Sequence, residues 1–311
     1  MHQITGQVAG TTRFPKYDAA TLGFEHYWYP VMWSRDLRAK PVTLTLFGLP
    51  FVFTREAGTV RARALIGSRP PNYGEGGVRT FAVEECAGLV WVFNGSGEPR
   101  PLRAQVPEEL LRDDAVIEGR ITTRKGDWRY AAENGFDEGH VKFLHRDAWL
   151  VTFTHIPSYS TVAVHPDDEQ DPWITRNVSD VRFEAHYPGL GEWPKKRFWK
   201  HKKRGVRVSI RLPGMLRVHY GGWIHFETYV PTVPGRHRYL QIAMCNARGL
   251  QAAKFRAFYR GYLSWIFHRQ FNDQDAAMVE LMQTPPEQLY RPDISLIEWR
   301  RMCEAQIGAG A

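Results

Sequence analysis

Short alternating apolar segments that end at glycine or proline turns constrain the fold of this chain more than any other feature. Between residues 24 and 105 such segments predict four strands, at 42–47, 50–55, 78–83 and 89–93. After about residue 145, the Pro-Gly pairs at 188, 213 and 234 recur at the spacing of hairpins in an antiparallel sheet. The break at 97–109, with three prolines, separates these β-rich regions and predicts domains at 1–105 and 106–311.

Helical periodicity is confined to two segments of the second region. The first is predicted around residues 128–144, and the second is a long helix near the end of the chain. The predicted fold class is therefore α+β, with a small antiparallel β domain first. In the long helix, apolar side chains recur at i, i+3 and i+4, as in a helix that buries one stripe, and these are Phe255, Phe258, Tyr259, Tyr262, Ile266, Phe271, Met278, Val279 and Met282.

The composition is that of a globular protein without a membrane anchor. Its 311 residues are 43% hydrophobic, and no apolar stretch approaches the roughly 20 residues of a membrane span. The N-terminus lacks the apolar stretch of a signal peptide, so we expect a cytoplasmic protein. The three cysteines are too far apart for a Cys-x-x-Cys metal site. The net charge of +8 favours acidic partners.

Two histidines and a nearby aspartate form the pattern with the most chemical content. His140 and His145 are five residues apart, about 140° on an ideal helix, so both face one ion only if the helix ends or distorts between them. Asp137, three residues before His140, is placed to accept the spare imidazole N–H and fix the tautomer. Two imidazoles need one further carboxylate to complete the ligand set that suits Fe(II).

The periodicity of the long helix favours Asp275 as that carboxylate. Asp275 is in register with the buried stripe, whereas Asp273 lies about 200° away, in register with Glu280, and is predicted to face solvent. A lone inward carboxylate is costly unless it is paired or bound to a metal. The spacing alone fits equally well with ordinary core or surface histidines and a capping or paired acid.

A resemblance to a known family favours the metal site. The run 128–145, which contains Asn134, Asp137, His140 and His145, resembles the mononuclear-iron motif of Rieske-type aromatic-ring-hydroxylating oxygenases. The segment from Gln274-Asp275 to Glu280 is similar to their C-terminal ligand segment. The resemblance extends over most of the chain, through N-terminal segments at 27–31, 34–37, 40–42, 83–85 and 88–93.

The resemblance implies both a function and the residues that perform it. His140, His145 and Asp275 would hold one Fe(II), Asn134 would lie near the metal, and Asp137 would relay electrons from the cluster of a neighbouring subunit. It also implies a helix-grip catalytic domain, like that of START proteins, in a homotrimer. The expected reaction is the oxygenation of an aromatic or other hydrophobic substrate by O₂.

One motif of that family is missing from this chain. A Rieske [2Fe–2S] centre takes two Cys and two His, but the residues before His140 contain only His2, His26 and Cys86. A Gly/Pro-rich loop, 67–77, occupies the place of the cluster motifs. We therefore expect a small β domain that is a Rieske remnant without a [2Fe–2S] cluster. Electrons would then come from the substrate or from an acidic ferredoxin-like or reductase partner.

Other functions are compatible with the same residues. A metal-dependent hydrolase or lyase would use the site to activate water, and a non-catalytic subunit would pair with a cluster-bearing homologous α subunit. The basic run 195–204, with interleaved aromatics, fits a solvated hairpin best, an acidic redox partner or anionic substrate next, and nucleic acid least. Phe136, Phe143 and Trp223 are predicted to line an apolar substrate pocket.

Overall fold

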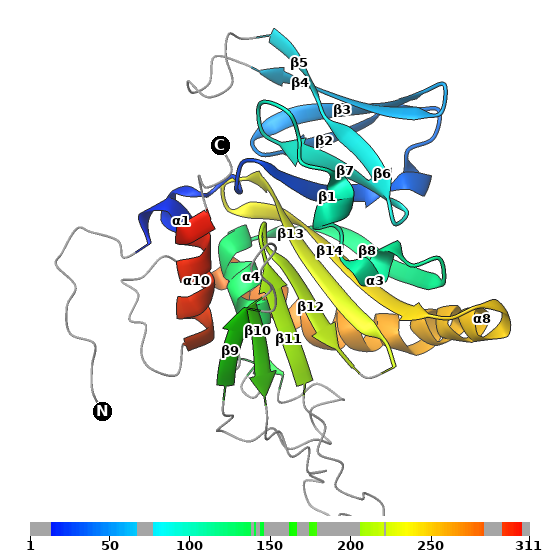
Figure 1. Cartoon of the computed structure of the whole chain (residues 1–311), viewed down its shortest axis with the longest axis vertical. Coiled ribbons are helices and arrows are strands. Elements are labelled where there is room, and N and C mark those ends of the chain that lie inside the picture. The colour runs from blue at the N-terminus through cyan, green and yellow to red at the C-terminus, as the bar shows by residue number, and fades with distance from the viewer. Residues whose placement is uncertain are drawn as a thin grey trace, which may run out of the picture.

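Three antiparallel sheets and a long helix make up the described part of the chain (Figure 1). The structure, a computed structural model, describes residues 14–66, 77–137, 140, 144–145, 162–166, 174–178, 206–220, 222–282 and 294–306. The predicted α+β class is confirmed. The division into domains at 1–105 and 106–311 stays a prediction. Among the described residues, no helix is both long and apolar enough to cross a membrane.

The N-terminal strands form two small sheets, with the orders β2-β3-β4-β5 and β1-β7-β6. Phe47 and Gly48 both have positive φ, 52° and 77°, as a two-residue primed hairpin turn requires, so β2 leads directly into β3. The predicted strands correspond to β2, β3, β5 and β7, and the sequence analysis missed the other three. The bounds are β1 Tyr27–Trp33, β2 Val42–Leu46, β3 Leu49–Glu56, β4 Thr59–Ile66, β5 Gly77–Phe81, β6 Val83–Cys86 and β7 Leu89–Asn94.

The larger sheet has seven strands in the order β8-β14-β13-β12-β11-β10-β9. Two predicted hairpin turns are present, because Pro213-Gly214 joins β11 to β12 and Pro234-Gly235 joins β13 to β14. The Pro-Gly pair at 188 and the basic run 195–204 lie outside the described residues. The bounds are β8 Ala115–Lys125, β9 Val162–Pro166, β10 Ile174–Val178, β11 Val206–Arg211, β12 Met215–His219, β13 Ile224–Val233 and β14 Arg236–Asn246.

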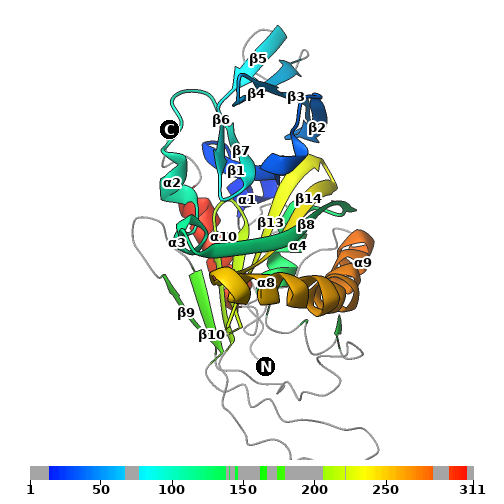
Figure 2. The same ribbon diagram turned by 90° about the vertical axis from the view of Figure 1, so that its right-hand side faces the viewer.

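The predicted long helix runs without a break from Gly249 to Leu281 and crosses one face of the seven-stranded sheet (Figure 2). It contains two π-helical segments, η3 Tyr259–Leu263 and η4 Ile266–Asn272, between α8 Gly249–Phe258 and α9 Asp273–Leu281. Each π segment changes the phase of the residues that follow it, and such segments often occur at functional sites. Phe258 and Tyr262, which were both predicted to lie in the buried stripe, are about half exposed.

The remaining helices pack around the ends of the sheets. The helix expected over residues 128–144 is interrupted, because α4 spans Trp128–Phe136 and Asp137 is not helical, whereas residues 140 and 144 are helical again. Helix α10, Ile294–Gln306, follows the long helix and was not predicted. It packs against α4, and Arg300 on α10 forms a buried ion pair with Glu133 on α4 (Nε–Oε1 2.5 Å). The other short helices are α1 Pro15–Ala19, η1 Ser34–Asp36, α2 Leu102–Gln105 and α3 Glu108–Leu111.

The two faces of the seven-stranded sheet are covered differently. We call the face toward the N-terminal sheets the back face, where Met215, Phe226, Val230, Leu240 and Ile242 join one apolar core with the N-terminal strands. We call the other the helix face, because α4 and the long helix lie against it. Alternation along each strand sends neighbouring residues to opposite faces, so one strand supplies both.

Candidate metal centre

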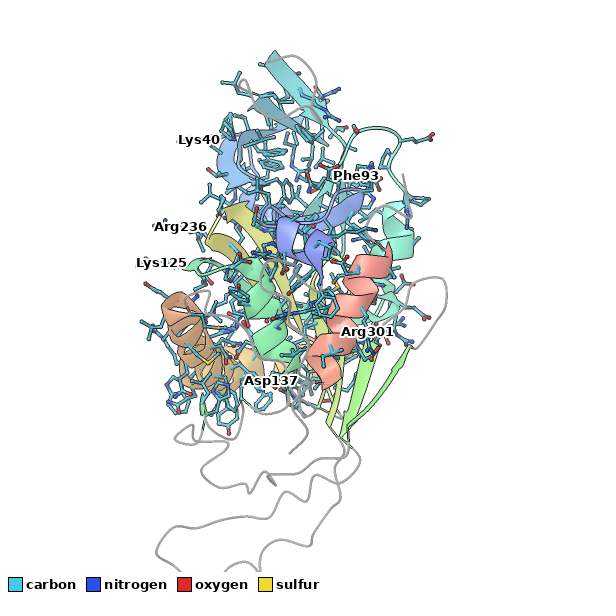
Figure 3. The ribbon with its side chains drawn as sticks, turned by 90° about the vertical axis from the view of Figure 1, so that its left-hand side faces the viewer. Lys40, Phe93, Lys125, Asp137, Arg236 and Arg301 are labelled. Atoms are coloured by element: carbon cyan, nitrogen blue, oxygen red, sulfur yellow. The ribbon has the colours of Figure 1, made fainter. Side chains whose placement is uncertain are left out.

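Helix α4 ends immediately before the predicted metal-binding residues. Asp127 caps its N-terminus by accepting a hydrogen bond from the backbone N–H of Arg129. At the other end, Asp137 adopts an extended conformation (φ −65°, ψ 133°) and lies at the end of α4 in Figure 3. Its Oδ2 accepts a hydrogen bond from the backbone N–H of His140 (2.8 Å). The helical path thus breaks between Asp137 and His140. Residue 144 is helical and His145 is not, so helical structure also ends between the two histidines, as their spacing requires.

The structure brings His140, His145 and Asp275 together from two distant segments. One potential ligand atom from each lies within 4.8 Å of the others. The Nε2 atom of His145 is 3.0 Å from Oδ1 of Asp275, and Nε2 of His140 is 3.8 Å from the same oxygen. The side chains are 1%, 10% and 18% exposed for His145, His140 and Asp275, so water has little access to the shared centre.

Each of the three side chains is held from behind by a further residue. Nδ1 of His145 is 2.9 Å from Oε1 of Gln274, and Nδ1 of His140 is 2.9 Å from the backbone oxygen of Asp137. Both oxygens accept a hydrogen bond from an Nδ1–H group, which leaves the two Nε2 lone pairs facing the centre. The amide of Asn134 donates to Oδ1 of Asp275 (2.9 Å).

Burial and the shared carboxylate shift the pKa values of the two imidazoles in opposite directions. Burial lowers the pKa of His140 despite the nearby charges of Asp275 and Asp137. Burial acts in the same direction on His145, but the hydrogen bond and charge of Asp275 outweigh it and raise the pKa of this residue. The ring closest to the carboxylate is therefore the one whose cationic form is favoured.

Two details of the predicted site differ from the structure. The carboxylate of Asp137 was expected to accept the imidazole N–H of His140, but its Oδ2 is 3.8 Å from Nδ1, and the backbone carbonyl takes that place because the helix has already ended. Asp273 was expected to face solvent. Its side chain is 29% exposed and forms ion pairs with Arg120 (3.0 Å) and Arg124, because β8 presents both arginines to this side of the helix.

A buried polar network behind the centre was not predicted. Glu227 on β13 accepts hydrogen bonds from Tyr229, from Nε2 of His225 (2.9 Å) and from the amide of Asn272 (2.9 Å). Burial alone would raise the pKa of Glu227, but His225 and the tyrosine hydroxyls lower it to about 2. Alternation along residues 223–229 was the available signal, since it places His225, Glu227 and Tyr229 on one face.

The predicted pocket residues occupy different surroundings. Phe136 is fully buried in the core cluster beside α4, Trp223 stacks on Tyr220 (ring centroids 4.6 Å apart), and Phe143 lies outside the described residues. A cavity of about 20 Å³, room for about one water molecule, adjoins the centre. It is lined by Arg124, Ala131, Asn134, Tyr229, His237, Tyr239, Asp275, Ala276 and Val279.

Comparison with known proteins assigns the class of protein to which this fold and site belong. The sequence profile of the homotrimeric ring hydroxylases matches residues 93–308, so the chain belongs to that family. The resemblance to aromatic-ring-hydroxylating oxygenases is thereby confirmed at the level of the family. The chain is an oxidoreductase of the aromatic oxygenase type.

Similar individual proteins are terminal oxygenase components of carbazole 1,9a-dioxygenases. The one from Sphingomonas sp. is 28% identical over 355 positions, which cover 91% of this chain and 92% of that protein. The solved structure from Nocardioides aromaticivorans IC177 has a TM-score of 0.78 and 24% identity, with 94% of this chain and 97% of that chain covered. A complex of oxygenase and ferredoxin gives a TM-score of 0.74 at 22% identity, over 97% and 96% of the two chains.

Proposed function

We propose that the chain is a mononuclear non-haem iron oxygenase that acts on an aromatic substrate and receives electrons from a separate redox protein. The observation that carries this proposal is the convergence of His140, His145 and Asp275, within 4.8 Å, in a member of the ring hydroxylase family. Two imidazoles and one carboxylate leave metal positions open and suit Fe(II).

The donor atoms present fit a divalent iron ion. Both imidazoles turn Nε2 toward the centre while Nδ1 is held by an oxygen of Gln274 or Asp137, the arrangement that fixes a ligating tautomer. Oδ1 of Asp275 lies 3.0 Å from Nε2 of His145, a separation that suits two ligand atoms of one ion. Iron bound here would supply the redox chemistry for adding oxygen to a ring.

The protein's own residues would orient the ligands and exclude water. Asn134 holds Oδ1 of Asp275 and so fixes which oxygen faces the imidazoles. Phe271 packs on His145 with ring centroids 4.5 Å apart, which gives the centre an apolar wall for an aromatic substrate. The side chain of Asp137 is 27% exposed beside the 10% exposed His140, so we assign it to the side of the centre that faces an electron donor.

The source of electrons is the step in which this chain differs from a Rieske oxygenase. No Cys-x-His or Cys-x-x-His motif occurs in its sequence, and its three cysteines, Cys86, Cys245 and Cys303, are far apart. The alignment with the Sphingomonas oxygenase spans 355 positions, more than the 311 residues of this chain, so that relative has internal segments that this chain lacks. We propose that one of these carries the cluster, and that an external donor replaces it here.

Ferredoxin is the donor class that the relatives support. Solved oxygenase structures similar to this chain contain a bound ferredoxin. The net charge of +8 favours an acidic partner of this kind. Docking of the two proteins would then weaken as salt screens their charges.

Iron analysis of two neighbouring variants tests the assignment of the centre. We expect about one iron per chain in the wild type, loss of iron in Asp275→Asn, and retained iron in the matched control Asp273→Asn, whose partners are Arg120 and Arg124. The same preparation should show no Rieske absorption. O₂ uptake with an aromatic substrate should depend on reduced ferredoxin.

Each arm has an outcome that contradicts the proposal. Equal iron content in Asp275→Asn and the wild type would remove Asp275 from the ligand set. Turnover with O₂ that is indifferent to added reductant would mean that the substrate supplies the electrons. Iron and substrate bound without any O₂ uptake would indicate a hydrolase, a lyase or a non-catalytic subunit.

A further inference from the structure

A buried ion pair joins the first and last described helices to helix α4, beside which both lie in Figure 1. Arg300 on α10 donates to both carboxylate oxygens of Glu133 on α4, from Nε to Oε1 (2.5 Å) and from Nη2 to Oε2 (2.7 Å). The hydroxyl of Tyr17 on α1 also donates to Oε1 (2.8 Å). Tyr17, Glu133 and Arg300 are 1%, 6% and 3% exposed, and we call these three residues the terminal clamp.

Further contacts make the terminal clamp one connected unit. The backbone N–H of Tyr17 donates to Oε1 of Glu304 on α10 (2.8 Å), and the backbone oxygen of Tyr17 accepts from Nη1 of Arg129 on α4 (3.1 Å). Burial and the charge of Glu133 raise the pKa of Tyr17 well above its ordinary value, so its hydroxyl keeps the proton that it donates. A movement of α1 or α10 therefore moves the carboxylate of Glu133.

Three consecutive residues hold the last turn of α4 from three directions, since neighbouring side chains of a helix point about 100° apart. Glu133 is held by the terminal clamp, and Asn134 donates to Oδ1 of Asp275 on α9 (2.9 Å). Gly135 lies against β13, where a Cβ atom would come within 2.8 Å of the hydroxyl of Tyr229. With so little free space, a displacement of Glu133 changes the contact between Asn134 and Asp275.

The same turn positions the segment that leads to His140. The backbone oxygen of Glu133 accepts a hydrogen bond from the N–H of Asp137 (2.7 Å), at the residue where α4 ends. Asp137 in turn accepts the backbone N–H of His140 at Oδ2 (2.8 Å) and lies against its Nδ1 through the backbone oxygen (2.9 Å). Glu133 is therefore next to the residues that hold two of the three proposed ligands.

We propose that Glu133 is a positioning residue of the metal centre, and that Arg300 and Tyr17 act on the centre through it. A buried ion pair gains little stability over apolar residues of the same volume, but its two-point contact fixes the orientation of the partners. Coupling between two sites is reciprocal, so bound metal also favours the docked position of α10. The inference rests on the proposed function only in treating the centre as a metal site.

Titration of the metal-free protein with Co(II), which stands in for Fe(II) and absorbs visible light, tests the coupling. We expect Arg300→Met to weaken Co(II) binding by about tenfold, as when a residue that holds a metal ligand is lost. Arg300→Lys keeps the charge without the two-point contact and should lose less. Arg301→Met is the matched control on α10 (Figure 3), because Arg301 is 54% exposed and pairs with Glu298, so binding should change less than about threefold.

Hydrogen exchange separates positioning from a general loss of stability. In metal-free Arg300→Met, the amides of Asp137 and His140 should exchange at least about fivefold faster than in the wild type, relative to the amides of β3. Added Co(II) should slow the exchange of α10 in the wild type and not in Arg300→Met.

The outcomes separate this inference from the assignment of the metal centre. Equal Co(II) affinity of Arg300→Met and a wild type that binds Co(II), or unchanged exchange at Asp137 and His140, would overturn the proposal. If Arg300→Met does not fold, Tyr17→Phe decides, because it removes one hydrogen bond, keeps the ion pair and should weaken binding by about threefold. Faster exchange in Arg300→Met, in a protein whose wild type binds no Co(II), would leave the role of Glu133 standing and remove the metal centre.

Discussion

The two faces of the seven-stranded sheet are made by the same strands and have opposite chemical character. On β13, Phe226 and Val230 enter the apolar core shared with the N-terminal sheets, while Glu227 and Tyr229 belong to the polar network under the helix. All four are at least 93% buried. Both faces are therefore equally buried. They differ in the chemical character of the groups that contact each side chain.

This contrast separates residues that hold the fold from residues that are available for chemistry. An apolar face gains its stability from close packing, which is lost roughly in proportion to the atoms removed. A polar buried face gains little net stability, and its hydrogen bonds instead fix the positions of individual atoms. The ligands of the proposed iron centre lie on the polar side.

The largest effect on the free energy of unfolding is expected from Phe226→Ala, which removes a large apolar side chain from the core on the back face. The side chain is 1% exposed, so its loss should lower the free energy of unfolding by about 3 to 5 kcal/mol. Iron content per folded chain should not change, since Phe226 points away from the centre. Urea unfolding measures the first quantity and metal analysis the second. Val52→Ala, at a side chain 40% exposed on β3, is the control that should change little.

A smaller, pH-dependent effect is expected from Glu227→Gln on the helix face. The folded-state pKa of Glu227, about 2, is below its ordinary value of 4.5, so the carboxylate contributes stability above pH 4.5 that is lost as the pH falls toward 2. The variant should be less stable than the wild type by about 3 kcal/mol at pH 7. The gap should close between about pH 5 and pH 2. If the difference in stability between the variant and the wild type does not change with pH, the hydrogen bonds of the network do not stabilise the negative charge of Glu227.

The smallest effect is expected where a polar pair is exposed. Lys125 and Glu280 form an ion pair (2.5 Å) with side chains 61% and 45% exposed. Solvent screens such a pair, so Lys125→Met should change the free energy of unfolding by no more than about 0.5 kcal/mol. If urea unfolding shows a loss of 2 kcal/mol or more, the exposure of a polar contact does not predict how much it contributes to the stability of this protein.

The sequence was most informative where a local pattern decides the structure. Alternation and turn residues predicted β2 and β3, and helical phase selected Asp275 over Asp273 for the centre, a choice with which the observed geometry agrees. The spacing of His140 and His145 required the helix to end or distort between them, and residue 144 is helical whereas His145 is not. Whether these residues bind iron stays a prediction.

The missed features depend on contacts between distant segments. Gln274 reaches His145 across 129 positions of sequence, and Asn272 reaches Glu227 across 45, so no local pattern indicates either bond. The π segments depend on how the helix packs on the sheet, and a stripe drawn at a constant period does not predict them. Asp273 was misplaced because the arginines that pair with it lie on β8.

The shared back-face core has a consequence for how such a protein changes over time. Met215, Phe226, Val230, Leu240 and Met244 pack in one apolar core with side chains of the N-terminal strands. A lineage of such proteins therefore has to keep these strands whatever else they carry, since deleting them would uncover the sheet. The same holds at the bench, where a truncated version that begins after residue 105 would expose this surface and aggregate.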